Sequence, residues 1–146
     1  MANIFHKILI LFFLPLVLYI LLLPAMPLME PDEGRYALIP QAMNHTADYV
    51  TPHLKGAVYL EKPPLGYWAT AVSYRLFGEN EWSSRLFPAL CAWGSILLAY
   101  AMGAFSHGQK TGLYSAAVLT TSLLFFAIGR INILDMPVSF FLGWSI

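Results

Sequence analysis

Charged residues are absent from three long stretches of the sequence, and this segregation constrains the fold more than any other feature. Residues 8–29, 86–109 and 111–129 contain no Asp, Glu, Lys or Arg. A helix that crosses the hydrocarbon core of a bilayer needs about 20 predominantly apolar residues. Each stretch meets that length, so the sequence predicts an all-α membrane protein with three full transmembrane helices.

The composition excludes several other classes of protein. Only 11% of the 146 residues are charged and 58% are hydrophobic, whereas a soluble domain has about 25% charged residues. Eight Lys and Arg balance eight Asp and Glu, which excludes a basic nucleic-acid-binding protein. The single cysteine, Cys91, excludes an internal disulfide and a CxxC metal site.

The apolar runs nearest the two ends need separate interpretation. Stretch 8–29 resembles a secretory signal peptide, but its apolar core exceeds the usual ~7–15 residues and Lys7 is its only basic flank, which favours an uncleaved anchor. A fourth apolar run, 136–146, is too short to span. Because a carboxylate buried in hydrocarbon is costly, we expect a truncated fourth helix. The chain is then either the N-terminal piece of a longer polytopic protein or the product of a truncated reading frame.

The charge pattern predicts three parts. They are an N-terminal anchor at 1–29, an external loop at 30–85, and helices two, three and the start of four at 86–146, with a second acidic loop at 130–135. Five Lys and Arg lie in the 30–85 loop, so the positive-inside rule alone would place it in the cytoplasm. Seven of the eight acidic residues lie there too, which is typical of a working surface. The residues by themselves leave the orientation open.

The first part of the loop predicts an amphipathic helix. Asp32 and Glu33 favour a helix start, because carboxylates are stabilised near exposed backbone N–H groups. Apolar residues then follow at helical spacing, and they are Tyr36, Ile39, Pro40 and Met43. We expect a short helix that lies on the membrane and is kinked or shortened by Pro40.

The second part of the loop predicts an extended run and an interfacial helix. Residues 58–60 follow a Lys-Gly turn signal, and Pro63-Pro64 are tolerated in a first helical turn. Tyr67, Trp68 and Tyr74 are typical of the lipid headgroup region, where amphipathic rings are enriched.

Asp32 and Asp135 are the first candidates for chemistry. Asp32 follows the first apolar stretch and Asp135 follows the third, so both emerge on the same side of a membrane in either orientation. Ionisable residues at such positions are costly to keep and suggest function. The alternative is that both simply cap helices.

Arg35 and Lys62 are candidate anion-binding residues. Arg35 shares a helix face with Asp32, so it forms either a local ion pair or a phosphate site. Lys62 precedes Pro63 at a helix start, where backbone donors and a mobile cation suit a phosphate. A lysine that snorkels at the membrane surface is the alternative.

Four strings now make the chain recognisable: EPDEGRYALIP (30–40), DYVTPHLKGAVYLEKPPLGYW (48–68), FGENEWSSRLFPAL (77–90) and GRINILDMPVSFF (129–141). They resemble the N-terminal part of bacterial lipid A aminoarabinose transferases and the related protein O-mannosyltransferases, which share the GT-C fold. The resemblance implies a glycosyltransferase of the inner membrane that moves a sugar from a polyprenyl-phosphate carrier to lipid A, a protein hydroxyl or another glycan. It also implies a cytoplasmic N-terminus and a periplasmic 30–85 loop.

The resemblance also implies roles for individual residues. Asp32 and Asp135 match the family's catalytic acidic positions. Lys62, Arg35 and Tyr59 match positions around the carrier phosphate. Glu61 matches a position linked to a metal in some members, so a divalent ion is a candidate cofactor.

The chain departs from this family in length, since those enzymes have many more spans and a soluble C-terminal domain. We therefore expect this chain to be inactive alone. Two other interpretations stay open: a non-catalytic membrane scaffold whose loop binds a lipid phosphate or a partner, and a transporter fragment. The clustering of charges at the ends of spans argues against a transporter.

Overall fold

A computed structural model describes residues 2–21, 23–25 and 27–145. Leu22, Met26 and Ile146, which fall in the predicted stretches 8–29 and 136–146, lie outside the described residues, as does Met1. The elements in chain order are α1 (Ala2–Leu21), η1 (Leu23–Ala25), α2 (Asp32–Thr46), β1 (His53–Leu54), β2 (Ala57–Val58), α3 (Leu65–Phe77), α4 (Glu81–His107), α5 (Gln109–Thr121), α6 (Leu123–Ile128) and α7 (Asp135–Trp144).

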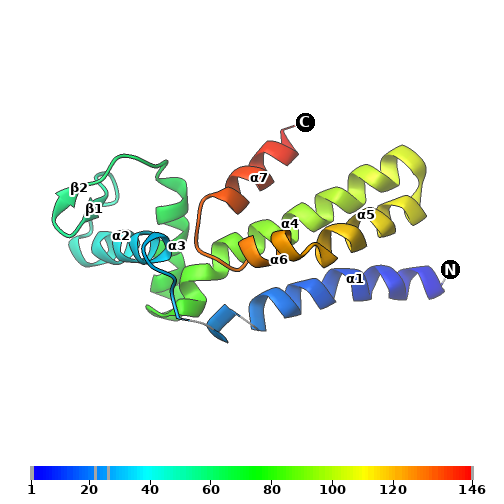
Figure 1. Ribbon diagram of the computed structural model, residues 1–146, viewed down its shortest axis with the longest axis horizontal. Coiled ribbons are helices and arrows are strands. Elements are labelled where there is room, and N and C mark those ends of the chain that lie inside the picture. The colour runs from blue at the N-terminus through cyan, green and yellow to red at the C-terminus, as the bar shows by residue number, and fades with distance from the viewer. Residues whose placement is uncertain (1, 22, 26, 146) are drawn as a thin grey trace.

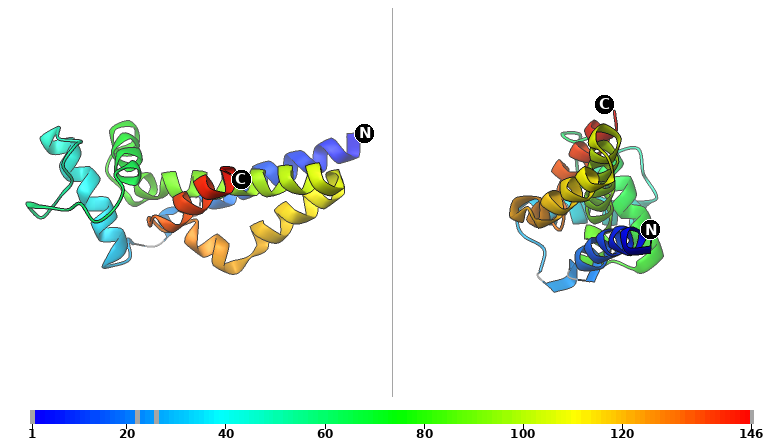
Figure 2. Two further views of the ribbon diagram at one scale, coloured as in Figure 1. Left: turned by 90° about the horizontal axis from the view of Figure 1, so that it is seen from above. Right: turned by 90° about the vertical axis from the view of Figure 1, so that its right-hand side faces the viewer.

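The helices form an elongated body with a separate group of elements at one end. Helices α1, α4, α5 and α6 run along the long axis, while α2, α3 and the β1–β2 hairpin gather at one end (Figure 1). Helix α7 packs against α4, and the end-on view in Figure 2 shows how compact the cross-section is. The apolar core lies between α1, α4, α5 and α7, around residues such as Tyr19, Ala92 and Ile96.

Helix α4 is the one helix among the described residues that is long and apolar enough to cross a membrane, with a shorter apolar helical stretch at Phe12–Leu21. It begins at Glu81, five residues before the predicted stretch, because Asn80 and Ser83 form a capping box. Two indole N–H groups, those of Trp82 and Trp93, donate to backbone carbonyls of α1 at 3.1 Å. Helix α1 is thereby fixed alongside α4.

The stretch 111–129 differs from prediction. It is not one helix, because α5 ends at Thr121 and α6 begins at Leu123, with Ser122 in an extended conformation between them. The hydroxyls of Thr120 and Thr121 donate back to carbonyls of the preceding turn, a geometry that bends and weakens helices. The expectation of a continuous third helix is therefore wrong, and the number of spans stays a prediction.

Helix α2 also departs from prediction. It continues through Pro40 to Thr46, and its apolar side chains Ile39 and Met43 are fully buried against Tyr67 of α3. The apolar face is thus covered by the protein itself. Tyr67 and Tyr74 are likewise buried, and Trp68 alone of the three predicted headgroup residues is exposed.

The predicted Lys-Gly turn is confirmed, whereas of the predicted extended run 58–60 only Val58 lies in a strand, β2 (Ala57–Val58). The hairpin turns at Lys55 and Gly56, both of which have positive φ, as a two-residue turn between antiparallel strands requires. Pro64 is the residue before the first turn of α3. This arrangement brings the segment that contains Tyr59, Glu61 and Lys62 back beside the start of α2.

Candidate active site

All six residues singled out from the sequence line one cavity of about 310 Å³. They are Asp32, Arg35, Tyr59, Glu61, Lys62 and Asp135, and the lining is completed by Tyr36, Tyr67, Ile133 and Leu134. Three carboxylates, one guanidinium and one lysine side chain therefore face the same space. Asp32 and Asp135 line this one cavity, while their emergence on one side of a membrane and their roles stay predictions.

Three separate elements supply these side chains. Asp32 and Asp135 are the first residues of α2 and α7. The segment between β2 and α3 contributes Tyr59, Glu61 and Lys62. Neither aspartate is the N-cap residue of its helix, since Pro31 and Leu134 occupy those positions. Their carboxylates are thus left available to the cavity.

A buried ion pair joins the start of α2 to helix α4, and the turn before α7 is bonded to the same carboxylate. Glu33 and Arg85 form a bidentate pair with distances of 2.8 Å (Nε to Oε1) and 2.7 Å (Nη2 to Oε2). The Glu33 side chain is fully buried and that of Arg85 is 4% exposed. The backbone N–H of Asn132 donates to Glu33 Oε1 at 2.8 Å, and that of Met29 donates to Oε2 at 2.8 Å. We call this set the Glu33 joint.

The Glu33 joint determines where the site forms. Glu33 follows Asp32 directly, and Asn132 lies three residues before Asp135. Arg85 also donates to the backbone carbonyls of Leu23 and Pro27 at 2.7 and 2.9 Å. The joint therefore connects the segment after α1, the start of α2, helix α4 and the turn before α7.

Burial opposes ionisation of Glu33, but hydrogen bonds from Arg85 and from the backbone of Asn132 and Met29 outweigh it, so the pKa of Glu33 is lowered. This pair was not predicted from the sequence, where Glu33 and Arg85 lie 52 positions apart. The signal that was available is the position of Arg85 inside a capped helix, where a charged residue requires a partner.

Two local pairs occupy the cavity wall. The guanidinium of Arg35 donates to Asp32, which raises the pKa of Arg35. The hydroxyl of Tyr59 donates to Glu61 at 3.0 Å, and this bond raises the pKa of Tyr59. The Asp32 and Arg35 side chains are 60% and 40% exposed, so solvent screens their attraction and the pair can open at small cost.

Lys62 and Asp135 are the free charges of the cavity. Neither side chain forms a hydrogen bond or an ion pair with any residue in the described parts of the chain. Lys62 is exposed at the cavity rim, directly before Pro63 and the start of α3. A cation with no protein partner is well placed for an incoming anion.

The residues present do not form a metal site by themselves. Across residues 2–21, 23–25 and 27–145, no three His, Cys, Asp or Glu side chains lie together in a way that could hold an ion. The Glu61 carboxylate already accepts the Tyr59 hydroxyl, and divalent ions such as Mg²⁺ and Ca²⁺ need more oxygen donors than one carboxylate. The role of Glu61 as a metal ligand stays a prediction, and no step is assigned to a metal.

An apolar groove adjoins the polar cavity. It has a volume of about 320 Å³ and is lined by side chains of the α3 start, α4 and α7, among them Leu65, Phe87, Pro137 and Phe141. Leu134 lines both spaces, and Pro63, the neighbour of Lys62, lines the groove. A charged cavity and an apolar groove thus meet at one side chain, which suits an amphiphilic ligand.

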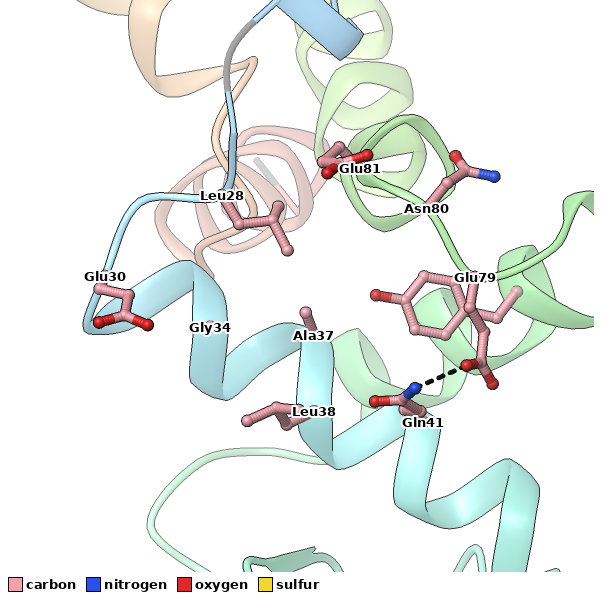
Figure 3. A pocket seen from close by; sticks show the side chains of 10 residues that line it. Leu28, Glu30, Gly34, Ala37, Leu38, Gln41, Glu79, Asn80 and Glu81 are labelled. Carbon is pink, nitrogen blue, oxygen red and sulfur yellow. Dashed lines mark hydrogen bonds between the residues drawn. The ribbon is translucent and has the colours of Figure 1, made fainter.

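A further cavity lies on the opposite face of α2 (Figure 3). Its volume is about 410 Å³, and its charged residues are Glu30, Glu79 and Glu81. Gln41 donates to Glu79 at 2.7 Å across it. Among the residues that the structure describes, no cation and none of the predicted site residues line this cavity, so it is not the candidate active site despite its larger volume.

Known proteins are similar to this chain in both sequence and fold. The dolichyl-phosphate-mannose-protein mannosyltransferase family matches residues 61–146. The undecaprenyl phosphate-alpha-4-amino-4-deoxy-L-arabinose arabinosyl transferase of Pseudomonas savastanoi pv. phaseolicola is 38% identical over 77% of this chain and 21% of its own length. The protein of the same name from Aeromonas hydrophila is 38% identical over 88% of this chain and 24% of its own.

A solved crystal structure is also similar to this chain. The crystal structure of ArnT from Cupriavidus metallidurans bound to undecaprenyl phosphate matches with a TM-score of 0.88 and 30% identity, over 93% of this chain and 25% of that one. The chain thus spans about a quarter of the length of the relatives it matches. Since the family match covers more than half of the sequence, the chain belongs to the dolichyl-phosphate-mannose-protein mannosyltransferase family of GT-C glycosyltransferases.

Proposed function

We propose that this chain forms the donor-binding and catalytic part of a glycosyltransferase that moves a sugar from a polyprenyl phosphate to an acceptor. The acceptor is lipid A, a protein hydroxyl or another glycan. The observation that carries the proposal is that two cations and three carboxylates line one cavity, which opens beside an apolar groove. The relatives named as undecaprenyl phosphate-dependent arabinosyl transferases support it.

The chemistry of sugar transfer matches this set of residues. As the acceptor oxygen bonds to the anomeric carbon, the bond from that carbon to the carrier phosphate breaks and its electron pair goes to the phosphate. Lys62 and Arg35 stabilise the growing negative charge, and Tyr59 donates to the phosphate. Asp32 orients or deprotonates the acceptor. Asp135 is the second catalytic carboxylate and faces the same cavity from the start of α7.

The Arg35–Asp32 pair gives this scheme an order of events. In the free protein each partner satisfies the other. When the carrier phosphate draws Arg35 toward itself, Asp32 is released for the acceptor. The base therefore becomes available when the donor is bound.

The proposal includes a place in the cell. We infer that the protein is a multi-pass protein of the bacterial inner membrane with a cytoplasmic N-terminus and residues 30–85 in the periplasm. The apolar length of α4 supports insertion. Cys91 is the only cysteine and is buried, so a cysteine introduced at Asp48 can be labelled selectively. A membrane-impermeant maleimide should label D48C in spheroplasts, and labelling only after lysis would contradict the orientation.

Binding of the carrier tests the proposal directly. The purified 146-residue protein in detergent is titrated with undecaprenyl phosphate and followed by its tryptophan fluorescence. Lys62→Ala should weaken binding by about tenfold or more, as expected for loss of a charged contact. Lys55→Ala is the matched control, since Lys55 lies in the hairpin turn and does not line the cavity. Equal affinities of the two variants would overturn the proposal.

Catalysis is tested separately from binding. We expect the chain to transfer no sugar alone, and detection of transfer by the purified chain would contradict that expectation. A chimaera in which this chain replaces the matching segment of the Aeromonas hydrophila relative should transfer sugar. Asp135→Asn should abolish that transfer while leaving carrier binding intact, whereas a scaffold would be indifferent to the change.

A further inference from the structure

The proposed mechanism leaves one buried polar group of the cavity without a purpose. Tyr67, in the first turn of α3, lines the cavity beside Lys62 and Asp135. Its side chain is fully buried. Its hydroxyl has no hydrogen-bond partner within the described part of the chain. Buried hydroxyls are nearly always paired in native proteins, so an unpaired one requires an explanation.

The Tyr67 ring is fixed in place and cannot turn its hydroxyl toward solvent. It belongs to a buried cluster with Ile39 and Met43 of α2, and it lies 5.9 Å from the Tyr36 ring, centroid to centroid. The preceding residue, Gly66, is in close contact with Leu134, because a Cβ there would come within 2.8 Å of that side chain. Neighbours on three sides therefore determine the position of the hydroxyl.

The surroundings of this hydroxyl are polar and include two cations, Arg35 and Lys62, that line the same cavity. The charged and titratable groups that act on it are Tyr36, Tyr59, Arg35 and Glu61, all of which line the same cavity. Burial raises the pKa of Tyr67, so the group stays protonated at neutral pH and remains a donor. Because this hydroxyl is already removed from water and unpaired in the free protein, it gains a hydrogen bond when an acceptor oxygen arrives and loses none.

Tyr59 offers the contrast. Its hydroxyl already donates to Glu61, so a ligand must replace that bond before Tyr59 can donate to it. For Tyr67 the exchange is not needed. A ligand in this cavity therefore gains more from a hydrogen bond with the Tyr67 hydroxyl than from one with the Tyr59 hydroxyl.

We infer that the Tyr67 hydroxyl donates a hydrogen bond to a phosphate oxygen of the polyprenyl-phosphate donor, beside Lys62 and Arg35. This inference rests on the proposed function and adds a ligand-binding residue to it. Tyr67 then binds the leaving group through its phosphate, which gains charge as the sugar departs. The unpaired hydroxyl raises the free energy of the free protein, and the hydrogen bond to the phosphate removes that penalty in the complex.

Tyr67→Phe tests the inference, with Tyr19→Phe as the matched control. Tyr19 carries a second buried hydroxyl without a partner among the described residues, but it lies in the helical core against Phe126, 5.1 Å between ring centroids, and does not line the cavity. Removing either hydroxyl should leave the unfolding temperature of the free protein unchanged or raise it. Only Y67F should weaken binding of undecaprenyl phosphate, by about tenfold.

Three ligands are measured with each variant: undecaprenyl phosphate, inorganic phosphate, and undecaprenol, which lacks the phosphate. Y67F should weaken the two phosphate ligands and leave undecaprenol unaffected. Loss with undecaprenyl phosphate alone would assign the bond to the lipid headgroup, and equal loss with inorganic phosphate would assign it to any phosphate.

The remaining outcomes overturn the inference. If Y67F binds undecaprenyl phosphate as tightly as the wild type, the inference fails and the proposed function stands. If Y67F lowers the unfolding temperature while Y19F does not, the hydroxyl has a structural role. If the wild type binds no undecaprenyl phosphate, the proposed function fails and the inference fails with it.

Discussion

Two neighbouring carboxylates, Asp32 and Glu33, lie in regions with opposite physical character. Both pair with an arginine. Glu33 is fully buried in a bidentate pair with Arg85, whereas Asp32 is 60% exposed and pairs with Arg35 one helical turn away. The Glu33 joint connects segments 52 and 99 positions apart, and the Asp32 pair is local.

The difference separates positioning from chemistry. A buried pair is costly to break because each partner would be left charged without water, so the Glu33 joint is suited to hold elements together. An exposed pair opens at small cost, so Asp32 and Arg35 are suited to exchange partners. Adjacent residues can thus serve opposite purposes because one side of α2 is covered by protein and the other faces a cavity.

The largest expected effect is that of Arg85→Ala. This change leaves Glu33 charged and buried without its partner, and it removes the donors to Leu23 and Pro27. We expect the free energy of unfolding to fall by about 3–5 kcal/mol, measured by circular dichroism in detergent with added denaturant. Arg75→Ala is the control, since Arg75 is exposed on α3. Similar stability of the two variants would show that the joint is not structural.

A smaller effect should follow pH. The folded-state pKa of Glu33 is lowered, so the carboxylate stabilises the folded protein above the unfolded value of about 4.3, and this stabilisation is lost as the pH falls through the folded pKa. The stability difference between wild type and Glu33→Gln should therefore be constant near pH 7 and shrink below about pH 4. If the stability difference between the two proteins grows on acidification instead, the folded-state pKa of Glu33 is raised and not lowered.

The smallest effect on stability is expected for Asp32→Asn, one residue away. Its pair is exposed and local, so the unfolding midpoint should be nearly unchanged. In the active chimaera, however, sugar transfer should fall by about 100-fold or more, as expected when a general base is lost. Asp48→Asn serves as control, because Asp48 receives two backbone N–H groups and lies outside the cavity. A large loss of stability in D32N would remove the contrast between the two regions.

The candidate site was predictable because its residues carry local signals. Asp32 at a helix start and Lys62 before two prolines each stand out from the apolar sequence around them. Asp32 and Asp135, which each follow an odd-numbered apolar stretch, line one cavity, even though the third stretch is not one helix. Position along the chain was sufficient for this grouping.

The tertiary partners were not predictable in the same way. Helical spacing identified the apolar face of α2, but the choice between a lipid surface and α3 depends on Tyr67, which lies 28 positions after Ile39. Periodicity states which side of a helix is apolar and not what covers it. The pairing of Glu33 with Arg85 was missed for the same reason, since a charge inside a helix indicates that a partner exists but not which residue 52 positions away supplies it.

The 99 positions between Glu33 and Asn132 also have a consequence in time. At a synthesis rate of about 5–20 residues per second, Asn132 is made roughly 5–20 s after Glu33. Until then the Glu33 carboxylate lacks one of its donors, and the turn before Asp135 has no fixed place. The loop that bears most of the charged residues is therefore translated early and becomes a site late. The two aspartates can therefore share a cavity only after translation has reached the turn before Asp135.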